Sequence, residues 1–283
     1  MSEAKPLTLR GIPETLLTTL YLRALETQRP DALIMDEKAV ELVNRLSANT
    51  TIRYDFERVR RIPLSETNRL VIILRNRQID RRAQEFLRRH PISTVVHIGC
   101  GLDARFERLD NGQVEWFDLD LPDVIALRRR LIGDERDRYH LLGCSVFDDA
   151  WMEALSAHRR QPVLFLAEGV FMYFDEAQVK SLVLKLRDHF PGVELVFDIH
   201  TPLHNLVSNI QLTRSLVPHL RWGMWSAKEV ESWAAGIRLL DVWGFFDEPT
   251  PRLKSIRWFR PLESLFRTQR IYHFQLGYAE GFG

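Results

Sequence analysis

Cysteine is scarce in this chain, which has only Cys100 and Cys144 in 283 residues. Two cysteines cannot build a disulfide framework, so the small disulfide-stapled class of secreted domains is excluded. The cysteines and histidines are nowhere spaced as metal ligands, and the sequence has neither a Gly-x-Ser-x-Gly elbow nor a Walker-type loop. We therefore expect no metal centre.

Long apolar runs and an excess of charge are missing as well. No run reaches the roughly 18 apolar residues of a membrane helix, and no signal peptide is recognisable, so we expect a soluble, cytoplasmic protein without a membrane partner. The formal net charge of +1 argues against a dedicated nucleic-acid binder. Arginine clusters such as Arg128 to Arg130 are interleaved with acids and are interpreted as solvated helix faces.

What the sequence does contain is a helical first third followed by alternating strands and helices. Asp36 and Ser65 are placed to cap helices before Ser93. From Thr94 onward the alternation predicts a parallel sheet wrapped by helices. The predicted strands are 94–98, 113–118, 139–143, 163–167 and 193–199, and the predicted helices between them are 103–109, 122–131, 149–157 and 176–189.

The pattern changes after His200. A helix is predicted over 201–221, and a capping box at Ser226–Glu229 predicts another that ends at Gly236. Two late strands are predicted, over 237–246 and 271–278. An irregular insert followed by two strands resembles the seven-stranded methyltransferase sheet, whose final strand is antiparallel.

A glycine turn and a strand that ends in acids carry the functional information. The apolar run 95–98 stops at Gly99-Cys-Gly101, where the backbone can turn and a ligand can approach it closely. The next strand ends in Asp118 and Asp120, where an acid holds a ribose hydroxyl in nucleotide-binding folds. The pair predicts a nucleoside-bearing cofactor. Because Gly99, Gly101 and Ala104 also fit the dinucleotide fingerprint, an NAD-dependent oxidoreductase is an alternative, as is a cofactor-binding protein without catalysis.

Read together, the motifs resemble the leucine carboxyl methyltransferase family, and within it the bacterial branch of tetracenomycin-type polyketide O-methyltransferases. The resemblance runs from about residue 15 to residue 278. It rests on Gly99-Cys-Gly-Leu-Asp-Ala-Arg105, Trp116-Phe-Asp-Leu-Asp-Leu-Pro-Asp-Val124, Ala167-Glu-Gly-Val-Phe-Met-Tyr173, Arg221-Trp-Gly-Met-Trp225 and Tyr272-His-Phe-Gln-Leu-Gly277.

The resemblance implies a class I, Rossmann-like α/β methyltransferase that uses S-adenosylmethionine. It implies a helical lid over residues 1–92 and a cofactor-binding core over 93–283, with a substrate-covering insert at 201–236. It also implies a set of cofactor residues: Gly99 and Gly101 in the turn, Asp120 with its neighbour Asp118 at the ribose, Glu168 and Arg75 at the methionine end, and Arg23 as a weaker second basic residue.

The adenine subsite departs from the family pattern. Where the family often has an Asp-Leu pair after the third strand, this chain has Ser145-Val146, and Asp148 is the nearest acid that could substitute.

The resemblance further implies an oxygen acceptor on a small molecule, without fixing the oligomeric state. A carboxylate is already ionised at neutral pH, whereas a phenol benefits from a general base. No base dyad is evident, which favours a carboxylate, and the aromatic side chains of the predicted pocket wall favour an aromatic or polyketide-like acid. A phenolic acceptor and a protein carboxyl terminus are the alternatives. The predicted acceptor residues are His200, as the base that a phenol would need, with Phe171, Tyr173, Trp222 and Trp225 as pocket wall.

Overall fold

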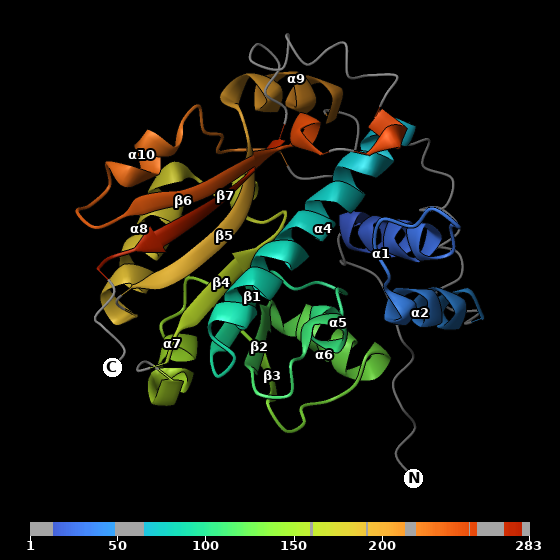
Figure 1. Cartoon of the computed structure of the whole chain (residues 1–283), viewed down its shortest axis with the longest axis horizontal. Helices are drawn as coiled ribbons and strands as arrows, with labels where there is room; N and C mark the ends of the chain where they lie inside the picture. The colour runs from blue at the N-terminus through green and yellow to red at the C-terminus, as the bar shows by residue number, and fades with distance from the viewer. Residues whose placement is uncertain are drawn as a thin grey trace.

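The computed structural model describes residues 14–48, 65–158, 161–190, 192–212, 219–248, 250–253 and 269–278. Within these ranges, seven strands form one sheet in the order β3-β2-β1-β4-β5-β7-β6 (Figure 1). The strands are β1 (Thr94–Ile98), β2 (Glu115–Asp120), β3 (Tyr139–Gly143), β4 (Val163–Ala167), β5 (Val193–His200), β6 (Arg238–Gly244) and β7 (Gln269–Leu276).

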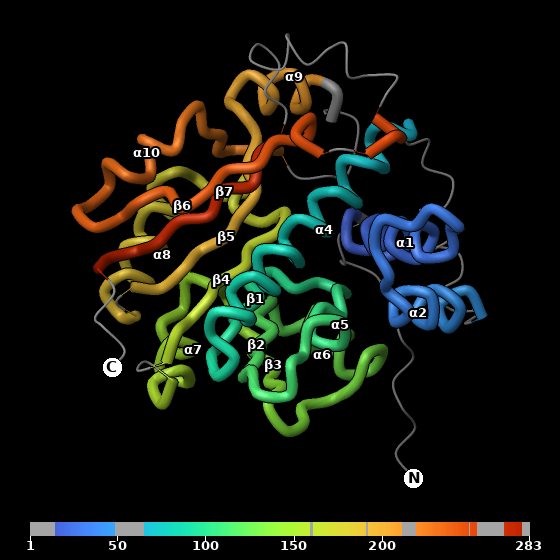
Figure 2. The backbone as a smooth tube through the Cα atoms, viewed as in Figure 1, coloured from blue at the N-terminus to red at the C-terminus, as the bar shows by residue number. Residues whose placement is uncertain are grey.

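The sheet has the predicted topology. Strands β1 to β5 pair in parallel, and β7 pairs antiparallel with both β5 and β6. Figure 2 shows this last strand lying between β5 and β6. Ile98 aligns with Leu119 of β2 and with Ala167 of β4, so three strands end together at one edge. Ligands of open parallel sheets bind at this carboxyl edge.

Helices cover both faces of the sheet. One face packs against α4, α5 and α6, and the other against α7, α8 and α10. None of the helices in the described part of the chain is both long and apolar enough to cross a membrane. The helices are α1 (Glu14–Thr27), α2 (Glu37–Ala48), α4 (Glu66–Arg89), α5 (Arg105–Leu109), α6 (Pro122–Leu131), α7 (Ala150–Ala154), α8 (Glu176–His189), α9 (Pro202–Leu212) and α10 (Ala227–Glu231), with 3-10 turns η1 (Ser156–His158), η2 (Phe171–Tyr173), η3 (Phe245–Asp247) and η4 (Pro251–Leu253).

Helix α4 crosses the sheet from its carboxyl edge to its amino edge (Figure 1). The Ser65 hydroxyl accepts a hydrogen bond from Asn68 N, as the capping prediction required. An apolar row that includes Leu70, Leu74 and Ala83 is buried against the sheet. The same helix also buries polar side chains, which reach the functional edge described below.

The structure differs from the predictions after β5. Helix α9 is described as far as Leu212, residues 213–218 lie outside the described chain, and residues 219–221 are not helical, in contrast to the prediction. Helix α10 ends at Glu231, well before Gly236. Gly236 has φ of +83°, and a Cβ there would lie 3.1 Å from the backbone of Gly277. The glycine therefore permits a close approach of two chain segments and does not mark the helix end.

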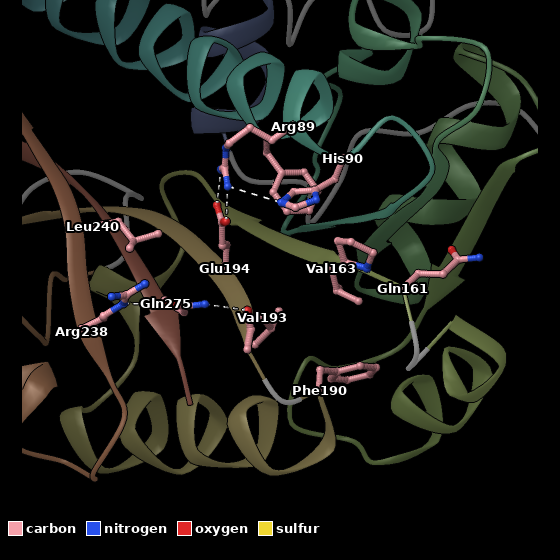
Figure 3. Close-up of a pocket in the computed structure, with 13 residues that line it drawn as sticks. Arg89, His90, Gln161, Val163, Phe190, Val193, Glu194, Arg238, Leu240 and Gln275 are labelled. Carbon is pink, nitrogen blue, oxygen red and sulfur yellow. Dashed lines mark hydrogen bonds and ion pairs between the residues drawn. The ribbon is translucent and has the colours of Figure 1, made fainter. Parts of the chain in front are cut away.

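Glu194, at the start of β5, is a buried carboxylate at the amino edge of the sheet. Arg89 of α4 donates one hydrogen bond to each of its oxygens, both at 2.8 Å, and His273 Nε2 lies 2.7 Å from Oε2. Figure 3 shows the Arg89–Glu194 pair beside a surface cavity that Phe190 and Val163 also line. Burial opposes ionisation, but His273 and Arg89 outweigh it and lower the pKa of Glu194 to about 2.

This pair predicts an acid-sensitive contribution to stability. A carboxylate whose folded-state pKa is lowered stabilises the fold above its unfolded pKa and loses that contribution as pH falls to the folded value. We expect Glu194→Gln to cost on the order of 3 kcal/mol at neutral pH, and the difference from wild type to shrink as pH falls from about 4.5 toward about 2. Urea unfolding at several pH values measures this. The exposed Glu176→Gln is the control, and a Glu194→Gln deficit that persists at low pH would contradict the prediction.

Candidate active site

The glycine turn follows β1 at the carboxyl edge. Gly99 and Gly101 have φ of +64° and +51°, values that side chains other than glycine rarely adopt. A Cβ on Gly99 would collide with Val170, and one on Gly101 would lie 3.2 Å from Leu16 of α1. The turn therefore fits closely between the segment after β4 and the first helix. Its contact with a cofactor stays a prediction.

Asp120 ends β2 and binds the glycine turn directly. Its carboxylate accepts hydrogen bonds from Gly101 N at 2.8 Å and from Leu121 N at 2.7 Å. Burial raises the pKa of Asp120, against the opposing effect of these two bonds. The half-buried carboxylate lies at the edge of the sheet, where the sequence predicts a ribose contact.

Asp118 is a correction to the predicted cofactor set. It is buried, and it pairs with Arg128 of α6 while accepting hydrogen bonds from the Tyr139 hydroxyl at 2.7 Å and Trp116 Nε1 at 2.9 Å. These partners use both carboxylate oxygens inside the core. Arg128 is likewise fully buried, so it is not part of a solvated helix face.

Glu168 follows β4 and is held by two arginines. Arg75 Nε lies 2.9 Å from Oε1, Arg105 binds Oε2, and Asn76 Nδ2 lies 3.3 Å from the same oxygen. Burial would raise the pKa of Glu168, but Arg105 and Arg75 lower it to about 2. The carboxylate is therefore ionised at neutral pH, and Arg75 and Glu168 present opposite charges side by side.

Behind this pair lies a buried ionic network that the sequence reasoning missed. Arg105 Nε is 2.6 Å from Asp80 of α4, and its terminal amino group is 3.1 Å from Asp103. Arg108 binds the same two carboxylates. The network joins α4, the glycine turn and Glu168. Asp103 and Arg105 both lie in the glycine motif of residues 99–105. The motif therefore already showed an acid and a base next to the turn, which could have indicated an ion pair there.

Arg23 is a second correction. It is buried and donates to Asp36 at 2.8 Å and to the Leu102 carbonyl at 3.0 Å. It joins the first helices to the glycine turn, and this structural pairing replaces the predicted cofactor contact.

The predicted adenine residues form one turn after β3. Ser145 N donates to the Asp148 carboxylate at 3.0 Å, and the Val146 carbonyl accepts from Trp151 Nε1 at 3.0 Å. The preceding Cys144 N donates to the Asp120 carbonyl, so the turn adjoins the predicted ribose site. The role of these residues in binding adenine stays a prediction.

The predicted acceptor residues separate into two groups. Phe171 is fully buried against Phe197, and Trp222 is buried and stacked on the same ring at 6.0 Å. Both belong to the core, which corrects their assignment to the pocket wall. Tyr173 is half-buried beside Arg75, and Trp225 is half-exposed, so the role of these two as pocket wall stays a prediction.

His200 ends β5 and stacks on His204 of α9, with ring centroids 4.4 Å apart. Its Nδ1 is buried, with no hydrogen-bond partner among the described residues. Burial, His204 and Arg75 hold the pKa of His200 well below its usual range, so the ring is neutral at physiological pH. Nowhere in the described ranges do three or more His, Cys, Asp or Glu side chains gather as metal ligands.

Comparison with known proteins identifies the family. Residues 16–186 match the leucine carboxyl methyltransferase family. The chain belongs to this family. It is 35% identical to the tetracenomycin polyketide synthesis O-methyltransferase TcmP of Streptomyces glaucescens, over 85% of this chain and 86% of that protein. It is 33% identical to the S-adenosyl-L-methionine-dependent methyltransferase dpfgK of Gibberella zeae, over 82% and 81%.

Solved structures support the fold. A putative methyltransferase from Thermobifida fusca superposes with a TM-score of 0.55 at 15% identity, covering 84% of this chain and 94% of that one. The chain is therefore an S-adenosylmethionine-dependent methyltransferase with a class I fold, as the sequence predicted. This result decides against the dinucleotide alternative.

The two aspartates of β2 are expected to behave differently on substitution. Asp120→Ala should weaken binding of S-adenosylhomocysteine by about 1–3 kcal/mol, because it removes a charged acceptor from the edge of the site. Asp118→Ala should instead destabilise the fold by about 3–5 kcal/mol, because it leaves Arg128 buried without its carboxylate. Calorimetry and urea unfolding on both variants separate the two effects. A large affinity loss in Asp118→Ala with unchanged stability would reverse the assignment.

Proposed function

We propose that the enzyme methylates a carboxylate oxygen of a small acceptor with an aromatic or polyketide-like body. Two names support transfer to oxygen: the family is described as carboxyl methyltransferases, and one relative as a polyketide synthesis O-methyltransferase. Tyr173 and Trp225 supply aromatic surface on the acceptor side, and such surface favours a flat, apolar molecule.

The state of His200 is the observation that carries the choice of a carboxylate. A phenol with a pKa near 10 must lose its proton as the methyl group is transferred. His200 is the predicted base, but its buried Nδ1 has no acid partner in the described chain, and it stacks against a second neutral imidazole. A base with a strongly lowered pKa accepts such a proton poorly. A carboxylate needs no base, because it is already ionised.

The side chains at the carboxyl edge fit S-adenosylmethionine. Gly99 and Gly101 leave the backbone of the turn without side chains at the carboxyl edge, and Asp120 is placed to accept hydrogen bonds from ribose hydroxyls. Glu168 and Arg75 offer opposite charges for the ammonium and carboxylate groups of the methionine end. The Ser145–Asp148 turn adjoins Asp120 and is offered for adenine. When bound, the cofactor supplies an electrophilic methyl group on a sulfonium. The protein's part is to orient the acceptor oxygen and exclude water.

We also propose that residues 1–92 act as a helical cover of a core formed by residues 93–283, with the insert 201–236 over the acceptor. Leu16 of α1 packs against Gly101, and α4 contributes Arg75 and Asn76 to the surroundings of Glu168. These contacts support a contribution of the first helices to the cofactor site.

The proposal predicts the product and the effect of one substitution. A panel of aromatic and polyketide-like acids and phenols, incubated with methyl-labelled cofactor, should give an alkali-labile methyl ester. His200→Ala should change turnover by less than about threefold and leave its pH dependence flat, because no proton has to leave. Half-exposed His140→Ala is the control.

An alkali-stable methyl ether as product would establish the phenolic alternative. In that case His200→Ala should lower turnover about 100-fold, with partial rescue at high pH. Methylation of a peptide carboxyl terminus, with none of the small acids, would establish the third possibility.

A further inference from the structure

Strand β5 carries two buried carboxylates on the face that packs against α4. Glu194 and Asp198 are four residues apart, and their neighbour Val196 belongs to the core on this same face. Each carboxylate binds one arginine of α4 and one side chain of β7. Glu194 does so at the amino edge, with Arg89 and His273, and Asp198 does so at the carboxyl edge.

Asp198 is fully buried and joins three elements at the functional edge. Its Oδ1 accepts a hydrogen bond from Gly169 N, in the turn that follows Glu168. Its Oδ2 accepts from Gln269 Nε2 of β7 at 2.6 Å and lies 3.5 Å from a terminal amino group of Arg75. The carboxylate therefore fixes the turn after β4 and the arginine of α4 relative to each other.

Arg75 is shared between two carboxylates. Its Nε binds Glu168 at 2.9 Å, while its terminal group faces Asp198. We propose that Asp198 is a positioning residue, which holds the Arg75 guanidinium and the Glu168–Gly169 peptide in the orientation that receives the methionine end of the cofactor. This inference rests on the cofactor roles proposed above for Arg75 and Glu168.

Charge balance explains why a second carboxylate is needed. The methionine end carries one ammonium and one carboxylate, and these would engage Glu168 and Arg75 respectively. Glu168 already pairs with Arg105 as well as with Arg75, so the ammonium would be a third cation on this one carboxylate. Asp198 remains as a carboxylate that no ligand group can reach, because it is fully buried. It keeps Arg75 in place whether Glu168 is free or engaged.

The test compares two ligands that differ only where Asp198 is expected to act. S-adenosylhomocysteine has the amino-acid end, and 5′-methylthioadenosine shares the thioether nucleoside but lacks that end. Asp198→Asn keeps the shape and an acceptor for Gly169 N, and it removes the charge facing Arg75. Titration calorimetry on the full chain should show about tenfold weaker binding of S-adenosylhomocysteine, with 5′-methylthioadenosine changed by less than about twofold.

Glu194→Gln is the matched control, because it removes a buried carboxylate from the same strand with the same kinds of partner. It should leave both affinities within about twofold of wild type. Equal losses for both ligands in Asp198→Asn would indicate general damage to the fold, and no loss for either would remove the role; both results overturn the proposal. Wild-type protein that binds neither ligand would overturn the cofactor contacts and this role with them.

Gln269→Ala provides a second route if Asp198→Asn fails to fold. It removes one partner of the carboxylate and touches neither Arg75 nor Glu168. We expect a selective loss of S-adenosylhomocysteine affinity of about threefold. In an Arg75→Lys background, Asp198→Asn should add less than about twofold, because both act through one guanidinium. If Asp198→Asn instead weakened binding as much in the Arg75→Lys background as in wild type, Asp198 would not act through the Arg75 guanidinium.

Discussion

The buried guanidinium of Arg105 is the constraint on which the functional edge depends. Removing such a cation from water costs several kcal/mol, and only well-placed carboxylates offset that cost. Asp80, Asp103 and Glu168 supply them from α4, from the glycine turn and from the end of β4. None of these three elements can shift without exposing an unpaired charge to the interior. The relative placement of the turn and the acid is therefore fixed before any ligand arrives.

Two other buried arginines fix the backbone around this edge in the same way. Arg128 pairs with Asp118 beneath the glycine turn and donates to the Gly101 and Asp103 carbonyls. Arg23 reaches the Leu102 carbonyl from the other side. The backbone of the turn is thus held by arginines, whereas the sheet faces behind it are packed with apolar side chains. Held donors and acceptors of this kind need little reorganisation when charge must be stabilised.

Much of the fold could be predicted because its signals are local. The apolar runs of β1, β3 and β4 are bounded by turns, and their predicted limits agree with the structure. Glu168 and Asp120 could be picked out as cofactor candidates because Glu168 directly follows a strand and Asp120 is the last residue of one. Asp118 was misassigned because its partner Arg128 lies on another element, within a run that reads as a solvated face. Phe171 and Trp222 were assigned to a pocket because their shared contact, Phe197, is distant in sequence.

The position of β7 has a consequence for how the molecule is made. The last described strand pairs with β5 from Val193↔Leu276 to His200↔Gln269, and β6 is attached to the sheet through it. During synthesis, β5 emerges with one side unpaired and must wait for roughly 75 further residues. At typical elongation rates that interval lasts several seconds or more. An apolar strand edge is open for that time, and such an unpaired edge is a site at which a nascent chain can misassemble.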